Sequence, residues 1–492
     1  MLRCGPGLSS ICNTLLLSFI ALSFCLGQTK SYHSALRLEN GGKFKEASSL
    51  LEKILHEESA SLSPAEKDEI HFQLERMRRI RIDYSLAADE LYAELAHSIR
   101  NISKGEFERW IRKGKFDARM IDDTLRFVGT SRSNLFFRNS DIATRRIPPP
   151  EEYKFHEALL SNCILIEKAS DSSGVPYVLP KVFVVKMSLT TDSGVVKPGE
   201  TVKAWIPVPR KLPFQTGFSL VSSSSRPVDI SSEESQIRSV YMEQPTDSEG
   251  ATRFLIEYSY ETFGVHFNLE RDRVQPYNKS DSTYVKYTME APNLIFTDKI
   301  TRLSKEIVGR ESNPLLKAKK IYDWISRNIK YSFAREYSTI SNISDYCLTQ
   351  KYGDCGQEAM LFIALCRYNG IPTRWQSGWF TFPGAKDIHD WTEIYVSPYG
   401  WIPVDPYMGI LAKRYMMDLT PEQRKILHEF YFGGLDQYRM SANSDNNQVL
   451  MPAKKYFRSD DVDFQRGELE TDESNIYFNQ FDYSLTIQEK KP

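Results

Sequence analysis

The sequence predicts a multidomain α+β protein: an N-terminal helical domain, an antiparallel β domain, and a core in which a central helix packs against an antiparallel sheet. Apolar residues recur at helical spacing over residues 31–170, whereas from residue 181 they alternate with a period of two. Residues 359–366 then form an unbroken apolar run, followed by three strand-like segments. A chain of 492 residues is too long for one hydrophobic core, so several domains are expected.

The helical part begins with a predicted helix–turn–helix hairpin at residues 35–57, which bends at Gly41-Gly42. Further helices are expected at about 65–100, 104–114 and 117–128, and the Pro-rich stretch 145–153 predicts a stiff break. The expected domain order is a signal peptide at 1–27, a helical domain at 28–170, a sandwich-like antiparallel β domain at 175–290, the core at 295–410, and a C-terminal helix plus β extension at 411–492.

Charge and the N-terminus restrict the possible partners and location. A formal net charge of -1 argues against nucleic acid or an anionic membrane as a partner. Arg3 precedes an apolar stretch at 14–24 that is too short to span a membrane, and Leu26-Gly27 offers a cleavage site. We therefore predict a protein exported to the periplasm or secreted, with a lipoprotein as the less favoured alternative and no integral membrane segment after cleavage; the oligomeric state stays open.

Four cysteines follow the predicted signal peptide, at positions 163, 347, 355 and 366. They are too few in so long a chain for a disulfide scaffold. Cys163 and Cys347 could form a single disulfide or could both be free thiols, and the sequence leaves both possibilities open. The sequence contains no CxxC or His-x-x-His spacing, so we expect neither a metal site nor a cofactor.

Cys355 lies in "KYGDCGQEAMLFIALCRYNGIPTRW" (351–375), directly before the apolar run. Asp354 and Gly356 supply cap and turn chemistry, so Cys355 is predicted at the N-terminus of a buried helix. The helix dipole there favours a thiolate, which suits a nucleophile. The alternative is a small buried residue that serves packing alone.

A cysteine nucleophile needs a base, and the base needs an orienting group. His389 opens the strand-like "HDWTEIYV", and Asp405 lies between apolar residues in the next strand-like segment. Each residue alone has a structural explanation, because His389 could be a solvated histidine and Asp405 a turn residue. Together, the order Cys, His, Asp on a helix and two strands predicts a triad.

Strand register tests this prediction, because His389 and Asp405 must share a face of the sheet. A two-residue loop at Pro398-Tyr399 would place them on opposite faces. We therefore predict a longer odd-numbered loop or a β-bulge at residues 396–401.

Residues of about 297–410 resemble the transglutaminase-like superfamily, whose core is papain-like. The resemblance rests on "KAKKIYDWISRNIKY", on the cysteine segment, on "HDWTEIYV" and on "GWIPVDP", about a quarter of the chain. "VKAWIPVP" (202–209) is similar to the β domain that precedes this core in exported bacterial members. In the family, the matching cysteine, histidine and aspartate form the triad, which implies Cys355, His389 and Asp405.

The resemblance implies acyl chemistry on amides through a thioester, with a protein or peptide as substrate. The backbone N–H of Cys355 is a candidate oxyanion donor, with Gln350 or Tyr346 as side-chain candidates. Trp391 and Trp379 are candidate walls of the cleft, with a core position as the alternative.

Several functions remain open. We favour an exported cysteine hydrolase of the peptidase type, because water needs no dedicated amine site. A protein-glutamine transglutaminase or a peptide N-glycanase-like amidase is the alternative within the family. A non-catalytic binding scaffold is the alternative outside it, but a scaffold would be expected to lose at least one triad residue type.

Overall fold

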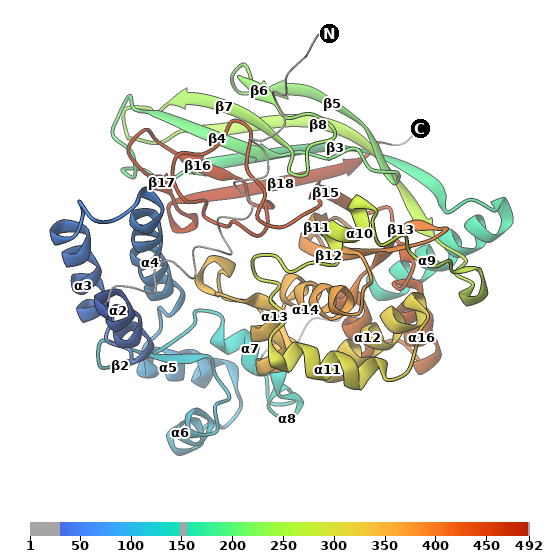
Figure 1. The fold of residues 1–492 in the computed structure, drawn as a ribbon, viewed down its shortest axis with the longest axis horizontal. Helices are drawn as coiled ribbons and strands as arrows, with labels where there is room; N and C mark the ends of the chain where they lie inside the picture. The colour runs from blue at the N-terminus through green and yellow to red at the C-terminus, as the bar shows by residue number, and fades with distance from the viewer. Residues whose placement is uncertain (1–29, 148–154, 491–492) are drawn as a thin grey trace, which may run out of the picture. The chain divides into compact units, whose positions relative to one another are not determined.

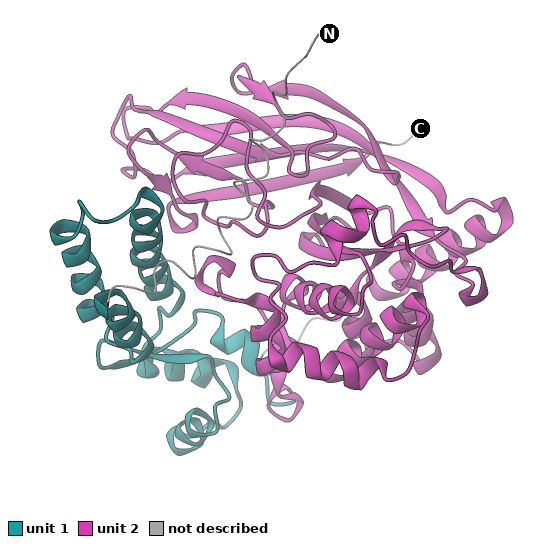
Figure 2. Cartoon of the chain, in the orientation of Figure 1, with its two compact units in different colours: residues 1–135, 144–148 teal, residues 136–143, 149–492 magenta. Residues whose placement is uncertain are grey.

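The computed structural model describes residues 30–147 and 155–490 (Figure 1). The chain divides into two compact units, residues 1–135 with 144–148 and residues 136–143 with 149–492 (Figure 2). The predicted signal peptide at 1–27 lies outside the described residues. Within 30–147 and 155–490, no helix combines the length and apolar character that crossing a membrane requires.

The first unit is mainly helical, as the sequence pattern predicts. Its turn at Gly41-Gly42 needs glycine because Gly42 has φ +81° and an added Cβ would lie 2.7 Å from the Met120 carbonyl oxygen. The elements of this unit are α2 (Lys30–Asn40), α3 (Phe44–Glu57), α4 (Pro64–Asp83), α5 (Ala88–Ser98), α6 (Lys104–Arg112), β1 (Ala118–Ile121) and β2 (Thr124–Phe127), and α7 (Ser131–Arg138) runs from this unit into the second.

The helix predicted at 117–128 is wrong, because these residues form the β1–β2 hairpin. Asp122 and Asp123 adopt φ values of 46° and 65°, which make a two-residue left-handed turn. Aspartate tolerates this conformation, so the Asp122-Asp123 pair indicates a hairpin turn, which the prediction of a helix did not take into account.

The β domain consists of two five-stranded sheets that share one apolar core. Inward residues such as Val185 and Tyr258 from one sheet meet Val202 and Met242 from the other, which confirms antiparallel strands from residue 181. The strands that come from this region are β3 (Tyr177–Thr191), β4 (Thr201–Pro207), β5 (Gln215–Ser223), β6 (Asp229–Ile230), β7 (Ser239–Pro245) and β8 (Arg253–His266).

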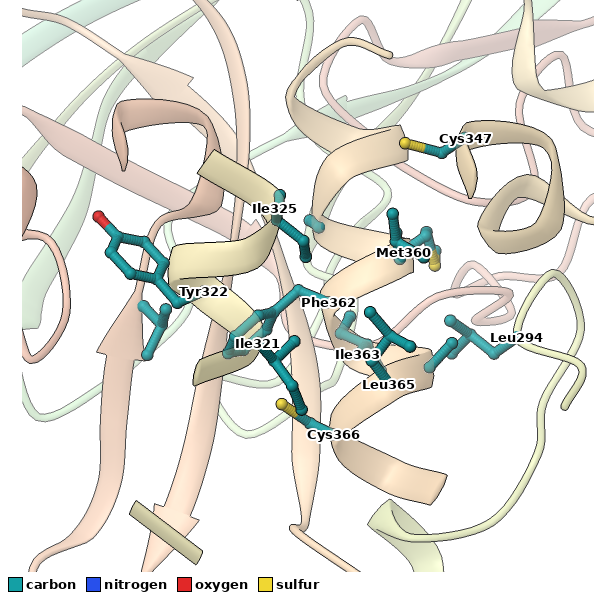
Figure 3. Close-up of a cluster of buried hydrophobic side chains, with 14 of the residues drawn as sticks. Leu294, Ile321, Tyr322, Ile325, Cys347, Met360, Phe362, Ile363, Leu365 and Cys366 are labelled. Atoms are coloured by element: carbon teal, nitrogen blue, oxygen red, sulfur yellow. The ribbon is translucent and has the colours of Figure 1, made fainter. Parts of the chain in front are cut away.

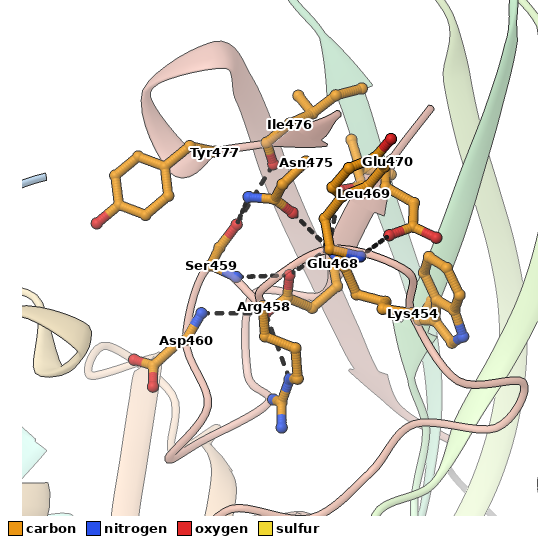
Figure 4. A network of polar contacts seen from close by, with 12 residues as sticks. Lys454, Arg458, Ser459, Asp460, Glu468, Leu469, Glu470, Asn475, Ile476 and Tyr477 are labelled. Atoms are coloured by element: carbon orange, nitrogen blue, oxygen red, sulfur yellow. Dashed lines mark hydrogen bonds and ion pairs between the residues drawn. The ribbon is translucent and has the colours of Figure 1, made fainter. Parts of the chain in front are cut away.

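Strands from the last sixty residues complete these sheets. β14 (Gly434–Leu435) and β18 (Phe481–Glu489) pair with β8 and β3, and β16 (Glu468–Glu470), which also pairs with β17 (Asn475–Ile476), pairs with β4. A buried polar network anchors the loops between them, since Glu468 accepts from Lys454 Nζ at 2.9 Å and from the Ser459 N–H at 2.8 Å (Figure 4). Helix α9 (Phe155–Ser173) packs on β3 and β8 and so belongs to this second unit, whereas the sequence pattern groups it with the preceding helices.

The core is built on a four-stranded sheet in the order β13, β12, β11, β15. Helix α14 (Cys355–Tyr368) packs on this sheet, and its apolar residues form one cluster with those of β12 and β13. Residues of α12 belong to the same cluster and lie beside α14 (Figure 3). This arrangement confirms a central helix against an antiparallel sheet. The strands are β11 (Thr373–Phe380), β12 (Asp387–Val396), β13 (Gly400–Val404) and β15 (Arg439–Asn443).

Cys163, Cys347 and Cys366 are fully buried free thiols, so no disulfide joins Cys163 to Cys347.

Further helices surround α14, and two short strands pair in parallel beside it. The remaining elements of the unit are α8 (Ser140–Ala143), α10 (Ser282–Tyr287), α11 (Asp298–Val308), α12 (Pro314–Asn328), β9 (Lys330–Tyr331), α13 (Ile343–Gln350), β10 (Tyr352–Gly353), α15 (Pro406–Arg414) and α16 (Pro421–Phe430), with short 3₁₀ turns at 271–273, 337–339 and 478–480.

Candidate active site

Cys355 is the first residue of α14, as predicted. The Asp354 side chain caps the helix by accepting from the Gln357 N–H at 3.0 Å, and the two residues form a reciprocal capping box. Tyr337 donates its hydroxyl hydrogen bond to the same Asp354 carboxylate at 2.8 Å. These contacts fix the first turn of the helix, and Cys355 itself is half-buried.

His389 and Asp405 are brought together by the register of β12 and β13. Val396 pairs with Gly400, so residues 397–399 form a three-residue connection, which confirms the predicted odd-numbered loop. Thr392 then lies opposite Val404, and His389 and Asp405 fall on the same face. His389 Nε2 lies 2.8 Å from Asp405 Oδ2.

Asp405 is fully buried and has three donors around its carboxylate. Besides His389, Arg439 Nη1 donates to Oδ2 at 2.9 Å, and the Met408 N–H donates to Oδ1 at 3.0 Å because Asp405 is the N-cap of α15. Burial alone would raise the pKa of Asp405, but His389 and Arg439 hold it below its usual value. Burial is also the main cause that lowers the pKa of His389, against the opposing effect of Asp405.

The thiol of Cys355 contacts a different carboxyl group. Its Sγ lies 3.7 Å from Asp390 Oδ2, and Gln465 Nε2 donates to the other oxygen of Asp390 at 2.7 Å. Asp390 follows His389 in β12, so the two side chains point to opposite faces of the strand. Among the described residues no hydrogen bond joins Cys355 to His389; the structure therefore pairs histidine with aspartate and cysteine with Asp390.

The electrostatics around Cys355 favour neutral groups. Burial raises the pKa of the Cys355 thiol, and the carboxylates of Asp390 and Asp354 raise it further. Burial likewise raises the pKa of Asp390 well above its usual range, with Asp463 and Asp354 adding to the shift. These effects on the pKa of Cys355 oppose the effect expected from the helix N-terminus, which favours a thiolate.

The candidate oxyanion donors and cleft residues differ in their surroundings. Gln350 is exposed at the end of α13, where its Oε1 accepts from the Tyr352 hydroxyl at 3.3 Å, and Tyr346 on the same helix packs near Tyr352. Their role as oxyanion donors stays a prediction. Trp391 and Trp379 are both buried in apolar clusters, which agrees with the alternative of core positions.

Sequence reasoning missed several neighbours of the site. Tyr407, two residues after Asp405, places its ring 5.2 Å from the His389 ring and 5.2 Å from the Tyr331 ring. Arg439 comes from β15, far along the chain, and no local pattern links it to Asp405. Asp390 shares β12 with two other acids, Asp387 and Glu393, so the local sequence does not distinguish it.

Glu358, one helical turn after Cys355, is fully buried, and neither of its carboxyl oxygens has a hydrogen-bond partner among the described residues. Burial raises its pKa well above the usual value. The folded state therefore holds this proton more tightly than the unfolded state, whose glutamate pKa is about 4.3. The contribution of Glu358 to stability falls as the pH rises above that value toward the folded-state pKa.

We expect Glu358→Gln to raise the free energy of unfolding at neutral pH by about 1–3 kcal/mol, because the amide cannot ionise in the buried site. The gain should shrink toward pH about 4. Urea unfolding across this pH range measures it. Glu306→Gln, at an exposed position of α11, is the control and should change stability by less than about 0.5 kcal/mol. A gain that does not depend on pH would contradict the assignment.

Residues 301–406 match the family model of the transglutaminase-like superfamily. The matched segment contains Cys355, His389 and Asp405 and extends from α11 to the start of α15. The chain therefore contains a transglutaminase-like core domain over these residues.

The comparisons also found more distant similarities. The uncharacterized protein YebA of Bacillus subtilis (strain 168) is 24% identical over 151 residues, which are 27% of this chain and 20% of YebA. This chain thus spans about a fifth of the length of that curated relative.

Two solved structures align with larger parts of the chain. A Cytophaga hutchinsonii chain described as a "Putative Cysteine Protease" has 18% identity and a TM-score of 0.42, covering 64% of this chain and 93% of that one. The periplasmic domain of TgpA from Pseudomonas aeruginosa has 14% identity and a TM-score of 0.26, covering 55% and 96%.

Proposed function

We propose that this protein is an exported cysteine-dependent enzyme that transfers the acyl group of protein or peptide amides, with water as the favoured acceptor. The observation that carries the proposal is the buried His389–Asp405 hydrogen bond of 2.8 Å in the same transglutaminase-like domain as Cys355, at the N-terminus of the central helix. Because Nε2 of His389 is engaged by Asp405, Nδ1 is the nitrogen left to exchange a proton with the thiol.

The proposed reaction has two steps. In the first, the His389 imidazole takes the Cys355 proton and the sulfur attacks the amide carbonyl carbon. The imidazolium then protonates the departing amine as the C–N bond breaks, which leaves a thioester on Cys355. In the second step His389 removes a proton from water, the hydroxide attacks the thioester, and the carboxylic acid leaves as the thiol is restored.

The contact between Cys355 and Asp390 fits the resting state of such an enzyme. Because burial raises the pKa of Asp390, this carboxyl group ionises less readily than an ordinary aspartate and opposes a thiolate at Cys355 less strongly. Hydrolysis rather than cross-linking remains the favoured reaction, and a transglutaminase or an N-glycanase-like amidase the alternative. A non-catalytic scaffold is the alternative if the thiol is not activated.

The test is the alkylation of Cys355 by limiting iodoacetamide at mildly acidic pH, with the modified cysteine mapped by mass spectrometry. An ordinary thiol with a pKa of about 8.5 reacts very slowly there. We expect fast labelling of Cys355 that His389→Ala abolishes. The other cysteines among the described residues, at 163, 347 and 366, are fully buried, so selective labelling of Cys355 could reflect its accessibility alone. The loss of labelling in His389→Ala is therefore the result that shows activation of the thiol.

A matched control is available within the same unit. His156 also pairs with an aspartate, since its Nδ1 lies 2.7 Å from Asp418 Oδ1 on a different part of the fold. His156→Ala should leave the labelling of Cys355 unchanged. Slow labelling in the wild-type protein, or equal rates in His389→Ala, would refute the proposed enzyme and favour the scaffold.

A further inference from the structure

Arg439 is a fully buried arginine bound between two carboxylates. Its Nη1 donates to Asp405 Oδ2 at 2.9 Å, and its Nε donates to Asp436 Oδ2 at 3.0 Å. The guanidinium carbon lies 4.6 Å from the centre of the Phe380 ring and 5.7 Å from that of Trp391. A guanidinium enclosed in this way has little freedom to move, so its hydrogen bonds have a fixed direction.

Asp436 is itself held in place. Its Oδ1 accepts from the Tyr438 N–H at 3.0 Å, and its Oδ2 accepts from the Tyr431 hydroxyl at 3.1 Å. The order of contacts is therefore Asp436, Arg439, Asp405, His389. Arg439 and Asp436 lie beyond residues 301–406, the part that matches the family model, and reach the site because β15 pairs with β11.

We propose that Arg439, fixed by Asp436, is a positioning residue that orients the Asp405 carboxylate toward Nε2 of His389. Its importance for catalysis rests on the proposed function, whereas its effect on the His389 ring does not. Asp405 Oδ2 accepts from both His389 and Arg439, and Oδ1 is bound by the helix N–H of Met408. With both oxygens held, the carboxylate cannot rotate away from the imidazole.

The charges make a lysine a poor substitute. Burial alone would lower the pKa of Arg439, but Asp436 and Asp405 raise it above its usual value, so the residue stays a cation. An ammonium group would retain the charge, but it lacks the planar fork that places one donor on each carboxylate. Loss of positioning and loss of charge can thus be separated by substitution.

The groups that face His389 come from three parts of the fold. They are Asp405 and Tyr407 at the start of α15, Asp387 on β12, and Arg439 with Asp436 on and just before β15. Asp405 and Asp436 favour the imidazolium, and Arg439 disfavours it. Asp436→Asn removes one negative charge and should lower the pKa of His389. The double variant Asp436→Asn/Arg439→Gln keeps the local net charge while it removes the bond from Arg439 to Asp405.

The experiment is 15N NMR of the histidine rings in the wild type, Arg439→Lys, Asp436→Asn and the double variant, with the His389 signal identified by its loss in His389→Gln. In the wild type the neutral ring should carry its proton on Nε2. The lysine and double variants should give a mixture of the two tautomers, and Asp436→Asn should keep the Nε2–H tautomer with a lower pKa. Asp436→Asn retains Arg439, so it tests the predicted effect of the neighbouring charges on the pKa of His389 even if the other variants fail to fold.

Alkylation of Cys355 supplies the second readout. If the proposed function holds, the double variant should label about tenfold more slowly at mildly acidic pH, equivalent to a rise of about one unit in the pKa for forming the thiolate–imidazolium pair. If the wild-type thiol is not activated, the proposed function fails while the NMR readout still tests Arg439.

Arg238→Lys is the matched control, because Arg238 is another buried arginine, bound to the carbonyl oxygens of Pro209 and Ser231 in the β domain. It should change stability and leave the His389 signals unchanged. A wild-type tautomer and pKa for His389 in both Arg439→Lys and the double variant would overturn the proposal.

Discussion

Asp405→Asn is expected to lower the free energy of unfolding by about 3–5 kcal/mol and to abolish the fast labelling of Cys355 at mildly acidic pH. The substitution keeps the helix cap to the Met408 N–H but removes the carboxylate that bonds both His389 and Arg439. An amide presents no full charge to the imidazolium, and in a triad such a change is worth about a 10,000-fold loss in rate. Urea unfolding and the alkylation rate measure the two effects.

The pH dependence of the stability loss follows from the lowered pKa of Asp405. A carboxylate whose pKa falls on folding stabilises the protein above its unfolded value of about 3.9, and this contribution disappears as the pH falls through the folded-state pKa. The difference between wild type and Asp405→Asn should therefore shrink below pH about 4.

Asp418→Asn provides the control for Asp405→Asn. Asp418 also bonds a histidine, His156, but its side chain is 44% exposed. Its loss should cost less than about 1 kcal/mol. Equal costs at both positions would contradict the view that burial makes the Asp405 interactions strong.

Gly378→Ala is expected to destabilise the protein by about 3 kcal/mol or more. An added Cβ at Gly378 would lie 1.7 Å from the Met440 carbonyl oxygen and 2.8 Å from its carbon, and both atoms belong to the backbone of β15. A side chain could move aside, whereas the strand moves only by breaking its pairing with β11. The urea midpoint should fall, and Arg439, one residue from Met440, should no longer hold Asp405.

The comparison for Gly378→Ala is Gly105→Ala on α6. There an added Cβ would lie 3.8 Å from a flexible Arg109 side-chain atom, which is an ordinary contact. This change should alter stability by no more than about 1 kcal/mol. A Gly378→Ala protein as stable as the wild type would show that β15 can separate from β11 at little cost.

Local sequence patterns were sufficient for the elements that carry the candidate residues. The apolar run after Cys355 predicts a buried helix, and Asp354 predicts its N-terminal cap, which the structure contains. The requirement that His389 and Asp405 share a face predicted the odd-numbered loop that the strand register confirms. These features depend on residues close together in the chain, and short-range hydrogen bonding and side-chain alternation determine them.

The same kind of pattern failed where turn chemistry competed with helical spacing. Residues 117–128 have apolar residues at positions that a helix could use, but the Asp122-Asp123 turn makes them a hairpin. A left-handed two-residue turn overrides a weak helical pattern because it directs the chain back on itself within two residues.

The sequence by itself determined the α+β class, the central helix with Cys355 at its start, and the pairing of His389 with Asp405. The tertiary structure alone decided what surrounds them. It places Arg439 on Asp405, Asp390 and Gln465 beside the thiol, and strands of the C-terminal extension in both sheets of the β domain. Burial raises the pKa of Cys355. The local sequence does not determine this shift, because desolvation depends on every segment that packs around the thiol.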